Sequence, residues 1–356
     1  MPTAPRGAID CDVHIPPPPT AALLPYLEPY WREQFSVRGL VGADFTLTTS
    51  ASRTPLACRP DWRPAKGEDP LALLRRHVLD PMGTAIAIGH CLHGAVALHT
   101  EDMAAALCRA VNDWVAAEWL SRDERLRASI LVPTQNVALA VAEVERCAAD
   151  RRFVQVLVLS MLDHPLGRRH WWPLYAAAAR HGLPLGIHAG GLNRHATTPT
   201  GWPSTHLEDH VVGAQAFDAQ LASLLTEGVF SEHPDLRVVL LESGFTWLST
   251  FLWRMNKIWR GLRAEVPWVT RMPAHILRQH VRVTLQPVDA PPRPEMLAAT
   301  LRQIDCEDML LFSTDYPHWQ YDGDAVLPEG LPDALLPKLL RDNALATYPR
   351  LAETAP

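Results

Sequence analysis

Three short apolar runs, spread from one end of the chain to the other, each end in side chains that bind metal ions. The first run carries Asp12 and His14, a central run leads into His188, and a late run is followed by Asp315. Parallel strands bring such groups together only if their carboxyl ends meet, as they do in an eight-stranded α/β barrel. The pattern therefore predicts a barrel with a divalent metal site at the carboxyl ends of its strands.

The rest of the chain alternates short apolar runs with amphipathic stretches. Met103, Leu107, Val111 and Trp114 are spaced to share one helix face. Further helices are expected over Asn136–Ala149, Trp172–His181, Gln215–Glu227 and Leu331–Leu345, and strands over Ile9–Asp12, Ala85–Ile88, Ala128–Val132, Val154–Leu159, Leu185–His188, Val238–Leu241, Val281–Leu285 and Met309–Ser313. Eight strands alternating with helices favour an α/β fold, the (β/α)8 TIM barrel, with an open doubly wound sheet as the alternative.

Two segments exceed what a minimal barrel needs. Residues 38–69 are predicted to leave the barrel after the first strand, and residues 190–206 to form a long, lid-like loop after the fifth. Both belong to the carboxyl-end face, where barrel active sites lie and long loops form substrate walls. We therefore expect one domain over residues 1–356, with insertions on its C-terminal face.

Charge and cysteine usage restrict the partners and the compartment. The net charge is −6, which argues against nucleic acid or an anionic membrane as a partner and leaves a small-molecule substrate. The six cysteines are scattered without a C-x-x-C pair, as is usual for core thiols in a reducing compartment. No apolar run approaches the ~18 residues of a membrane span, so a cytoplasmic protein is expected.

Each candidate site residue also has a plain structural interpretation. Asp12 and His14 lie two apart, so a strand points both to one side, but they could equally be a loop cap and a buried histidine. His188 could be a core histidine and Asp315 a helix cap. Glu242 follows the run Val238–Leu241, where it could be catalytic, support a ligand, or pair with an arginine such as Arg254.

Candidate substrate contacts come from the expected top-face loops. Trp202 and Trp319 are candidates for the pocket wall, and Arg194 and Arg254 for holding a substrate carboxylate. His206 and His210 are spaced for one helix face, but not in the H-E-x-x-H order of a zinc site. A substrate contact by His210 is favoured over a second metal site.

The same residues resemble the amidohydrolase superfamily, in its amidohydrolase-related branch with aminocarboxymuconate semialdehyde decarboxylase and related aromatic-acid decarboxylases and hydrolases. The resemblance covers most of the chain. It implies a (β/α)8 barrel with one divalent metal, bound by Asp12, His14, His188 and Asp315, and a homodimer. The motifs that carry it are Asp10–His14, Leu79–Gly83, Pro173–Ala177, Gly182–His188, Gly228–Phe230, Pro234–Val239, Glu242–Gly244, Pro317–Trp319 and Asn343–Ala344.

Two positions depart from that family pattern. The superfamily usually begins with His-x-His, and this chain has Asp12 at the first position, where some decarboxylases also carry an acidic residue. The sixth strand of the decarboxylases normally ends in a histidine, and this chain has Glu242 there. No lysine stands at a strand end, so a single metal is expected, without a carbamylated lysine.

Three functions follow from these residues. Two carboxylates and two imidazoles suit Zn²⁺ or Mn²⁺, and the leading hypothesis is hydrolysis of a small cyclic or acyl substrate by a metal-activated water, with Asp315 or Glu242 as base. The alternative is non-oxidative decarboxylation or another C–C lyase reaction, with Asp315, Glu242 or His318 supplying a proton. A catalytically inactive barrel scaffold is the third.

Overall fold

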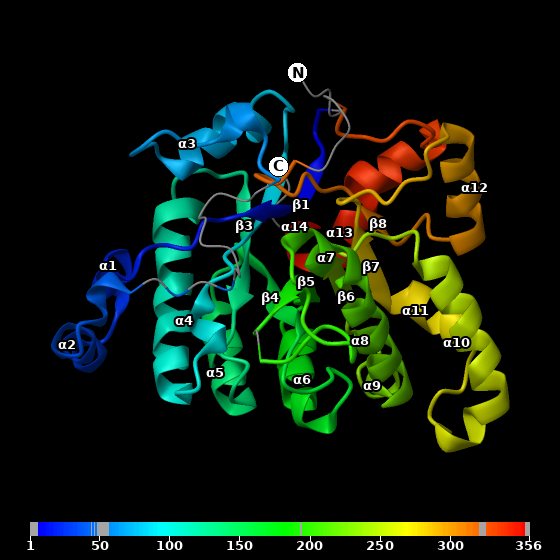
Figure 1. Ribbon diagram of the computed structural model, residues 1–356, viewed down its shortest axis with the longest axis horizontal. Coiled ribbons are helices and arrows are strands. Elements are labelled where there is room, and N and C mark those ends of the chain that lie inside the picture. The colour runs from blue at the N-terminus through cyan, green and yellow to red at the C-terminus, as the bar shows by residue number, and fades with distance from the viewer. Residues whose placement is uncertain are drawn as a thin grey trace.

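Eight parallel strands form one sheet in chain order and enclose the centre of the molecule (Figure 1). The computed structural model describes residues 6–43, 45, 47, 57–192, 194–319 and 325–352. The strands are β1 (Ile9–His14), β2 (Ile86–His90), β3 (Leu126–Leu131), β4 (Phe153–Met161), β5 (Leu185–Gly191), β6 (Val238–Leu241), β7 (Val281–Thr284) and β8 (Leu310–Leu311).

The sheet closes where the segment after β8 meets β1. The amide of Cys11 donates to the carbonyl of Phe312 at 2.9 Å, and that of Asp315 donates to the carbonyl of Asp12 at 3.0 Å. The result is a nearly closed barrel, which confirms the (β/α)8 prediction and excludes the open doubly wound sheet.

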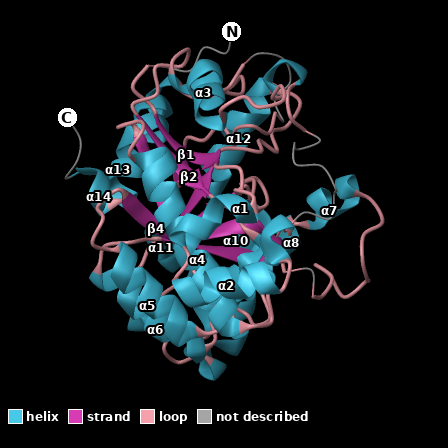
Figure 2. Cartoon of the chain, turned by 90° about the vertical axis from the view of Figure 1, so that its left-hand side faces the viewer, coloured by secondary structure: helices cyan, strands magenta, loops and turns pink. Residues whose placement is uncertain are grey.

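Helices follow the strands and cover the outside of the barrel (Figures 1 and 2). Asn136 starts one of them, because its side chain accepts from the amides of Ala138 and Leu139 at 3.0 and 3.2 Å. The helices are α1 (Thr20–Leu23), α2 (Pro29–Val37), α3 (Pro70–Leu74), α4 (Glu101–Val115), α5 (Val137–Cys147), α6 (Trp172–Arg180), α7 (His206–Val212), α8 (Ala214–Thr226), α9 (Val229–Glu232), α10 (Leu248–Leu262), α11 (Pro273–His280), α12 (Pro294–Ile304), α13 (Asn343–Thr347) and α14 (Pro349–Ala352). None of these described helices is both long and apolar enough to cross a membrane.

The predicted helix Leu331–Leu345 forms with mixed hydrogen bonding. It begins with a 3-10 turn at Asp333–Leu335, continues through a π-helical turn at Lys338–Asp342 and ends in α13. Leu336 and Pro337, which join the first two pieces, have right-handed helical backbone angles, so the segment is helical without interruption.

The two insertions differ in how they pack against the barrel. Residues 57–69 of the first pack onto the chain after β8: the amide of Trp319 donates to the carbonyl of Ala57 at 2.7 Å, and Trp62 stacks on His77 with ring centroids 5.5 Å apart. Residues 44, 46 and 48–56 lie outside the described residues. The second insertion leads to α7, which projects from the barrel and has no buried residue (Figure 2).

Candidate metal centre

Side chains from the carboxyl ends of β1, β5, β6 and β8 meet at one place. The ligand atoms of Asp12, His14 and His188 lie within 4.8 Å of one another, and so do those of a second group that shares His14. The second group adds the other predicted catalytic residues, and its members are His14, Glu242, Asp315 and His318. We call these six residues the strand-end cluster. It contains all four predicted metal ligands and all three predicted catalytic residues.

The donor atoms of the cluster fit a cation. Among the described side chains, both carboxylate oxygens of Asp12, Nε2 of His188 and Oε1 of Glu242 are buried without a hydrogen-bond partner. Leaving a buried carboxylate without a partner costs several kcal/mol, which a bound divalent ion would offset. Two of these residues, Asp12 and His188, are predicted metal ligands.

Asp315 is the most strongly held carboxylate of the cluster. Its Oδ1 lies 2.9 Å from Nε2 of His14 and 2.9 Å from Nδ1 of His318. Burial opposes ionisation of Asp315, but the two imidazoles outweigh burial and hold its pKa below the usual range. In return, although burial disfavours the imidazolium, the charge of Asp315 raises the pKa of His318 to about 9. Asp315 therefore enters the site as an anion.

The pKa values of Glu242 and Asp12 are raised, whereas that of Asp315 is lowered. Burial raises the pKa of Asp12 well above its ordinary value, with the charges of Asp315 and Glu242 adding to the shift. Burial and the charge of Asp315 also raise the pKa of Glu242 to about 8. Without a cation, the cluster therefore holds protons on carboxyl groups that a metal ion would displace.

Backbone strain marks two of these positions. Glu242 and Asp315 have φ of 59° and 57°, in the left-handed region that side chains other than glycine rarely occupy. Hydrogen bonds hold both turns, since the amide of Glu242 donates to Oγ1 of Thr284 at 3.0 Å and that of Asp315 to the carbonyl of Asp12 at 3.0 Å. Strain of this kind costs about 1–3 kcal/mol per residue and is often found at functional sites.

Two residues that support the cluster were missed in the sequence. Asp10 accepts from the amide and hydroxyl of Thr314 at 3.0 and 2.6 Å, which fixes the turn before Asp315. His90 lies 3.6 Å from Asp12, measured from Nε2 to Oδ1. The predicted second strand ends at Ile88 and leaves out His90, although this histidine follows an apolar run and ends β2.

His210 reaches the cluster from α7. Its Nε2 lies 3.8 Å from Oε1 of Glu242, and its side chain is 39% exposed. The ring of His206 lies 5.1 Å from that of His210. In the described part of the chain, the two are not in a group of metal-compatible residues.

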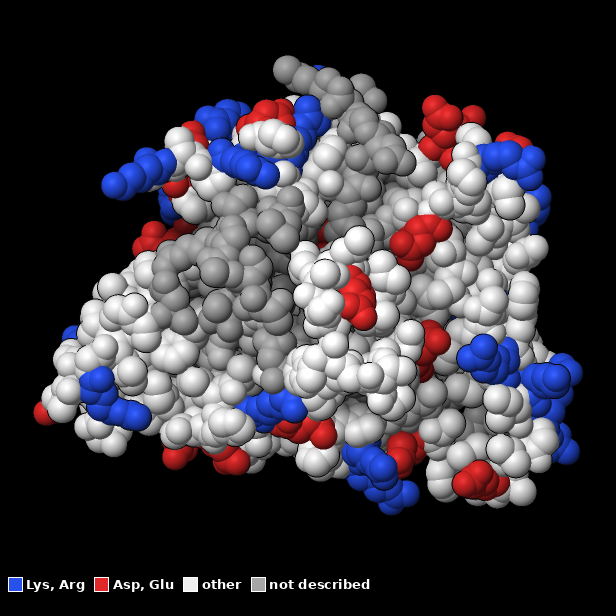
Figure 3. All heavy atoms as spheres, viewed as in Figure 1, with Lys and Arg blue, Asp and Glu red and all other residues white. Residues whose placement is uncertain are grey.

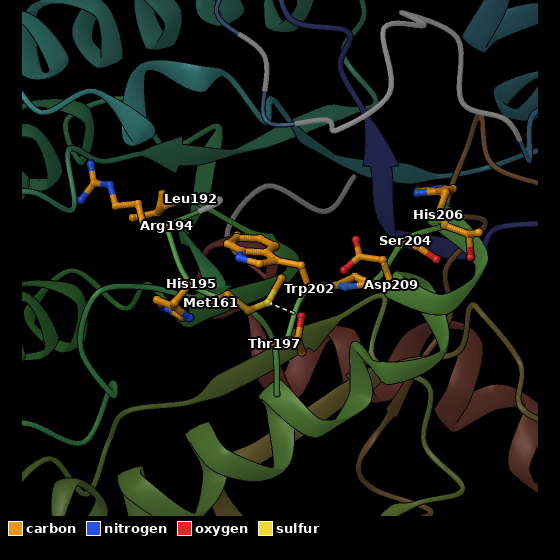
Figure 4. Close-up of a pocket in the computed structure, with 12 residues that line it drawn as sticks. Met161, Leu192, Arg194, His195, Thr197, Trp202, Ser204, His206 and Asp209 are labelled. Atoms are coloured by element: carbon orange, nitrogen blue, oxygen red, sulfur yellow. Dashed lines mark hydrogen bonds between the residues drawn. The ribbon is translucent and has the colours of Figure 1, made fainter. Parts of the chain in front are cut away.

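A cavity of about 260 Å³ is lined in part by His206 and Asp209 of α7 (Figure 4). Trp202, which is 59% exposed, lies beside Met161 and Thr197 in the wall of this cavity. The lining residues are Met161, Gly191, Leu192, Arg194, His195, Thr197, Trp202, Pro203, Ser204, Thr205, His206 and Asp209. Predicted substrate contacts Trp202 and Arg194 thus line one cavity, and none of its lining residues belongs to the strand-end cluster.

The remaining predicted contacts lie elsewhere. Arg254 is exposed on α10, where its charge acts on Asp218. Trp319 packs edge-on against Trp62 with ring centroids 4.8 Å apart, under the guanidinium of Arg59. Trp319 therefore forms part of the wall made by the first insertion, while the structure does not bring Arg254 to the cluster.

Arg194 also anchors its own loop to neighbouring segments. It pairs with Asp163 and donates to the carbonyl of Ala97 at 3.0 Å. On the face drawn in Figure 3, basic and acidic side chains are interspersed around the rim.

Comparison with known proteins extends over nearly the whole chain. The amidohydrolase family model matches residues 9–350. Gamma-resorcylate decarboxylase of Rhodococcus jostii (strain RHA1) is 27% identical over 236 residues, which are 62% of this chain and 69% of the relative.

Two solved structures share the fold at lower identity. An amidohydrolase from Mycobacterium avium subsp. paratuberculosis K-10 superposes with a TM-score of 0.69 and 22% identity, covering 96% of this chain and 99% of the other. A dihydroxybenzoic acid decarboxylase from Polaromonas sp. JS666, with bound manganese and the inhibitor 2-nitroresorcinol, gives a TM-score of 0.66 at 18% identity, covering 98% and 99%.

Proposed function

Because the chain belongs to the amidohydrolase family, an enzyme family, we propose that it is a metal-dependent, non-oxidative decarboxylase of an aromatic acid. The observation that carries the choice of reaction is the 27% identity with gamma-resorcylate decarboxylase of Rhodococcus jostii. The strand-end cluster supplies the donor atoms that such a reaction needs. Decarboxylation thus replaces hydrolysis as the first hypothesis.

We assign one divalent ion to Asp12, His14, His188 and Asp315. Two carboxylates and two imidazoles suit Mn²⁺ or Zn²⁺, and the manganese bound by the Polaromonas relative favours Mn²⁺. When bound, the ion would polarise the carboxylate of the acid and a neighbouring oxygen. It would also neutralise the two carboxylates that bind it.

The residues around the ion must supply a proton. Decarboxylation breaks the bond between the ring carbon and the carboxyl carbon, CO₂ leaves, and the electron pair stays on the ring carbon, which takes up a proton. In this proposal Glu242 gives that proton, and His318, whose Nδ1 lies 3.5 Å from Oε1 of Glu242, is a second donor. Water then returns a proton to the donor.

A path for that returning proton runs through α7. Glu242 has a side chain only 6% exposed, whereas that of His210 is 39% exposed and lies 3.8 Å away. His210 can therefore take a proton from water and pass it to Glu242. This gives His210 a role in addition to the predicted contact with substrate.

The cavity beside α7 is the proposed place for the substrate's aromatic ring. Its volume of about 260 Å³ is enough for a substituted benzoic acid, and Trp202 offers a ring face for stacking. Arg194 lines the same cavity, but its pairing with Asp163 reduces the charge it can offer to a carboxylate.

We further propose that the chain is a single domain that acts as a homodimer in the cytoplasm. The six described cysteines are all free and buried, in keeping with a reducing compartment. Light scattering on the purified protein tests the dimer: a monomer mass of 39.6 kDa would contradict it.

Metal-assisted hydrolysis is the second candidate, favoured by Glu242. This carboxylate stands where the decarboxylases normally have a histidine, and it lies beside the donor atoms of the cluster, where it could take a proton from an attacking water. The two reactions differ in their products, so one assay separates them.

The assay supplies Mn²⁺ and measures CO₂ release from a panel of 2-hydroxybenzoic acids, with a parallel panel of esters, lactones and amides. We expect CO₂ from at least one acid, and its loss in Asp315→Asn. The matched control is Asp305→Asn, because Asp305 also has a left-handed φ, of 55°, but caps α12 away from the cluster. Hydrolysis of a panel substrate without CO₂ release from any acid would replace the proposal with the second candidate.

A further inference from the structure

A line of buried hydrogen-bonded side chains crosses the interior of the barrel and ends at the strand-end cluster. The hydroxyl of Tyr348 lies 3.0 Å from Oε1 of Gln155, whose Nε2 lies 2.9 Å from Oγ of Ser129. Oγ of Ser129 in turn lies 2.9 Å from Nδ1 of His90. All four side chains are buried, so water does not compete for these bonds.

The carbonyl of Cys11, the last acceptor, determines in which direction every hydrogen bond of the line is donated. Nε2 of His90 lies 3.1 Å from the carbonyl of Cys11, which can only accept, so Nε2 carries the hydrogen. Nδ1 of the neutral ring then accepts from Ser129, and Ser129 accepts from the amide nitrogen of Gln155. The amide oxygen of Gln155 accepts from Tyr348. Each group donates toward His90 and holds it in one tautomer.

His90 acts on an irregular part of β1. Asp10 pairs with Ala87 and Val13 with Gly89, so two residues of β1 stand opposite a single residue of β2. Such a bulge turns a side chain in a new direction and leaves a carbonyl without its regular partner. The two residues opposite Ile88 are Cys11, whose carbonyl His90 binds, and Asp12.

We propose that His90 is a positioning residue that fixes the bulge of β1 and so presents Asp12 to the metal. Tyr348, Gln155 and Ser129 hold His90 in its Nε2–H tautomer. The inference rests on the proposed metal-dependent function. It assigns a role in metal affinity to residues with no donor atom in the cluster. Nε2 of His90 also lies 3.6 Å from Oδ1 of Asp12, beyond hydrogen-bonding distance, so its effect on Asp12 passes through the carbonyl of Cys11.

The line begins on the amino-end side of the barrel. Tyr348 follows α13 and precedes α14, and the neighbouring Arg350 donates to the carbonyls of His181 and Phe153 at 3.0 and 2.9 Å, ahead of β5 and at the start of β4. These are the amino ends of the strands. A change at this end of the barrel is therefore expected to alter metal binding at the other.

The first test reads the tautomer directly in the metal-free protein. Nitrogen-15 NMR of histidine-labelled protein distinguishes an Nε2–H ring from an Nδ1–H ring. We expect Nε2–H for His90 in the wild type and a shifted Nδ1 resonance in Ser129→Ala, which removes the hydrogen-bond donor to Nδ1. An Nδ1–H ring in the wild type would overturn the inference, whether or not the protein is a decarboxylase.

The second test measures the affinity for Mn²⁺ from the electron paramagnetic resonance signal of the free ion. Residues that orient metal ligands typically contribute about 10–100-fold in affinity, and we expect His90→Asn, which cannot reach Cys11, to lose that much. His90→Gln can place an amide nitrogen near the position of Nε2 and should stay within about threefold of the wild type. Equal losses in both variants would overturn the inference.

A matched pair of tyrosines separates positioning from general stability. Tyr348→Phe removes the first donor of the line, while Tyr175→Phe removes a hydroxyl that is equally buried but donates to the carbonyl of Leu166. We expect only Tyr348→Phe to weaken Mn²⁺ binding. Identical Mn²⁺ affinity in the two variants would overturn the role of Tyr348. Absence of Mn²⁺ binding in the wild type would contradict the proposed function and leave the NMR result to decide the inference.

Discussion

Replacing Glu242 by Gln should stabilise the metal-free protein. Burial and the charge of Asp315 raise the pKa of Glu242 from 4.5 to about 8. In the unfolded chain this carboxyl is ionised near pH 7, whereas in the folded protein it keeps its proton. The interval of about 2.5 pH units, at ~1.36 kcal/mol per unit, corresponds to roughly 3 kcal/mol of lost stability. Gln has nearly the same volume and does not ionise, so it removes this loss.

The sign of the pH dependence is the sharper part of this prediction. A raised carboxyl pKa leaves stability intact below the unfolded value, and stability declines as the pH rises from about 4.5 to about 8. Calorimetry of Glu242→Gln and wild type, both without metal, should give melting temperatures that differ by roughly 4 °C near pH 7 and by about 1 °C near pH 5. Glu33→Gln, at an exposed position of α2, serves as the control for removal of a carboxylate. A Gln variant that is less stable near pH 7, or a difference that does not change with pH, would refute the reasoning.

Three further predictions concern the cavity, the barrel rim and the interior line. Trp202→Ala should raise KM for the aromatic acid several-fold with little change in kcat, because Trp202 lines the cavity and is not part of the cluster. Steady-state kinetics measures both constants, and a fall in kcat with an unchanged KM would contradict this role. Burial opposes ionisation of Asp123, but Arg125 and Arg75 outweigh it and lower its pKa, so the stability it adds is present near neutral pH and lost in acid. Urea unfolding of Asp123→Asn should therefore show a loss of about 2 kcal/mol near pH 7 that shrinks toward pH 3, and a constant loss would contradict this assignment. Gly186→Ala places a Cβ 2.3 Å from Nε2 of Gln155, so it should weaken Mn²⁺ binding, and an unchanged affinity would show that the line tolerates the displacement.

The barrel and the gathering of the metal-binding side chains could be predicted because both depend on local sequence patterns. Asp12, His188 and Asp315 each follow an apolar run, and the parallel barrel then brings the ends of those runs together. Glu242 was identified in the same way. The left-handed backbone at Glu242 and Asp315 could not be read from the sequence, because it depends on hydrogen bonds to neighbouring strands.

Contacts that depend on long-range packing were harder to predict. His90 was missed because β2 extends two residues beyond its apolar run, and its role depends on a bulge in another strand. The charge of Arg254 and its place after the sixth strand predict a substrate contact, but Arg254 lies exposed on α10. Trp319 was expected in the substrate pocket, yet packing against the first insertion determines where its ring lies.

The most direct test of the proposed function is the rate of CO₂ release from an accepted 2-hydroxybenzoic acid as Mn²⁺ is added to metal-free protein. A mononuclear site predicts that the rate rises with Mn²⁺ and levels off at about one ion per chain. Asp12→Asn should release no CO₂ at the same Mn²⁺ concentrations. A rate that does not depend on Mn²⁺, or that is unchanged in Asp12→Asn, would contradict the assignment of the strand-end cluster as the metal site of a decarboxylase.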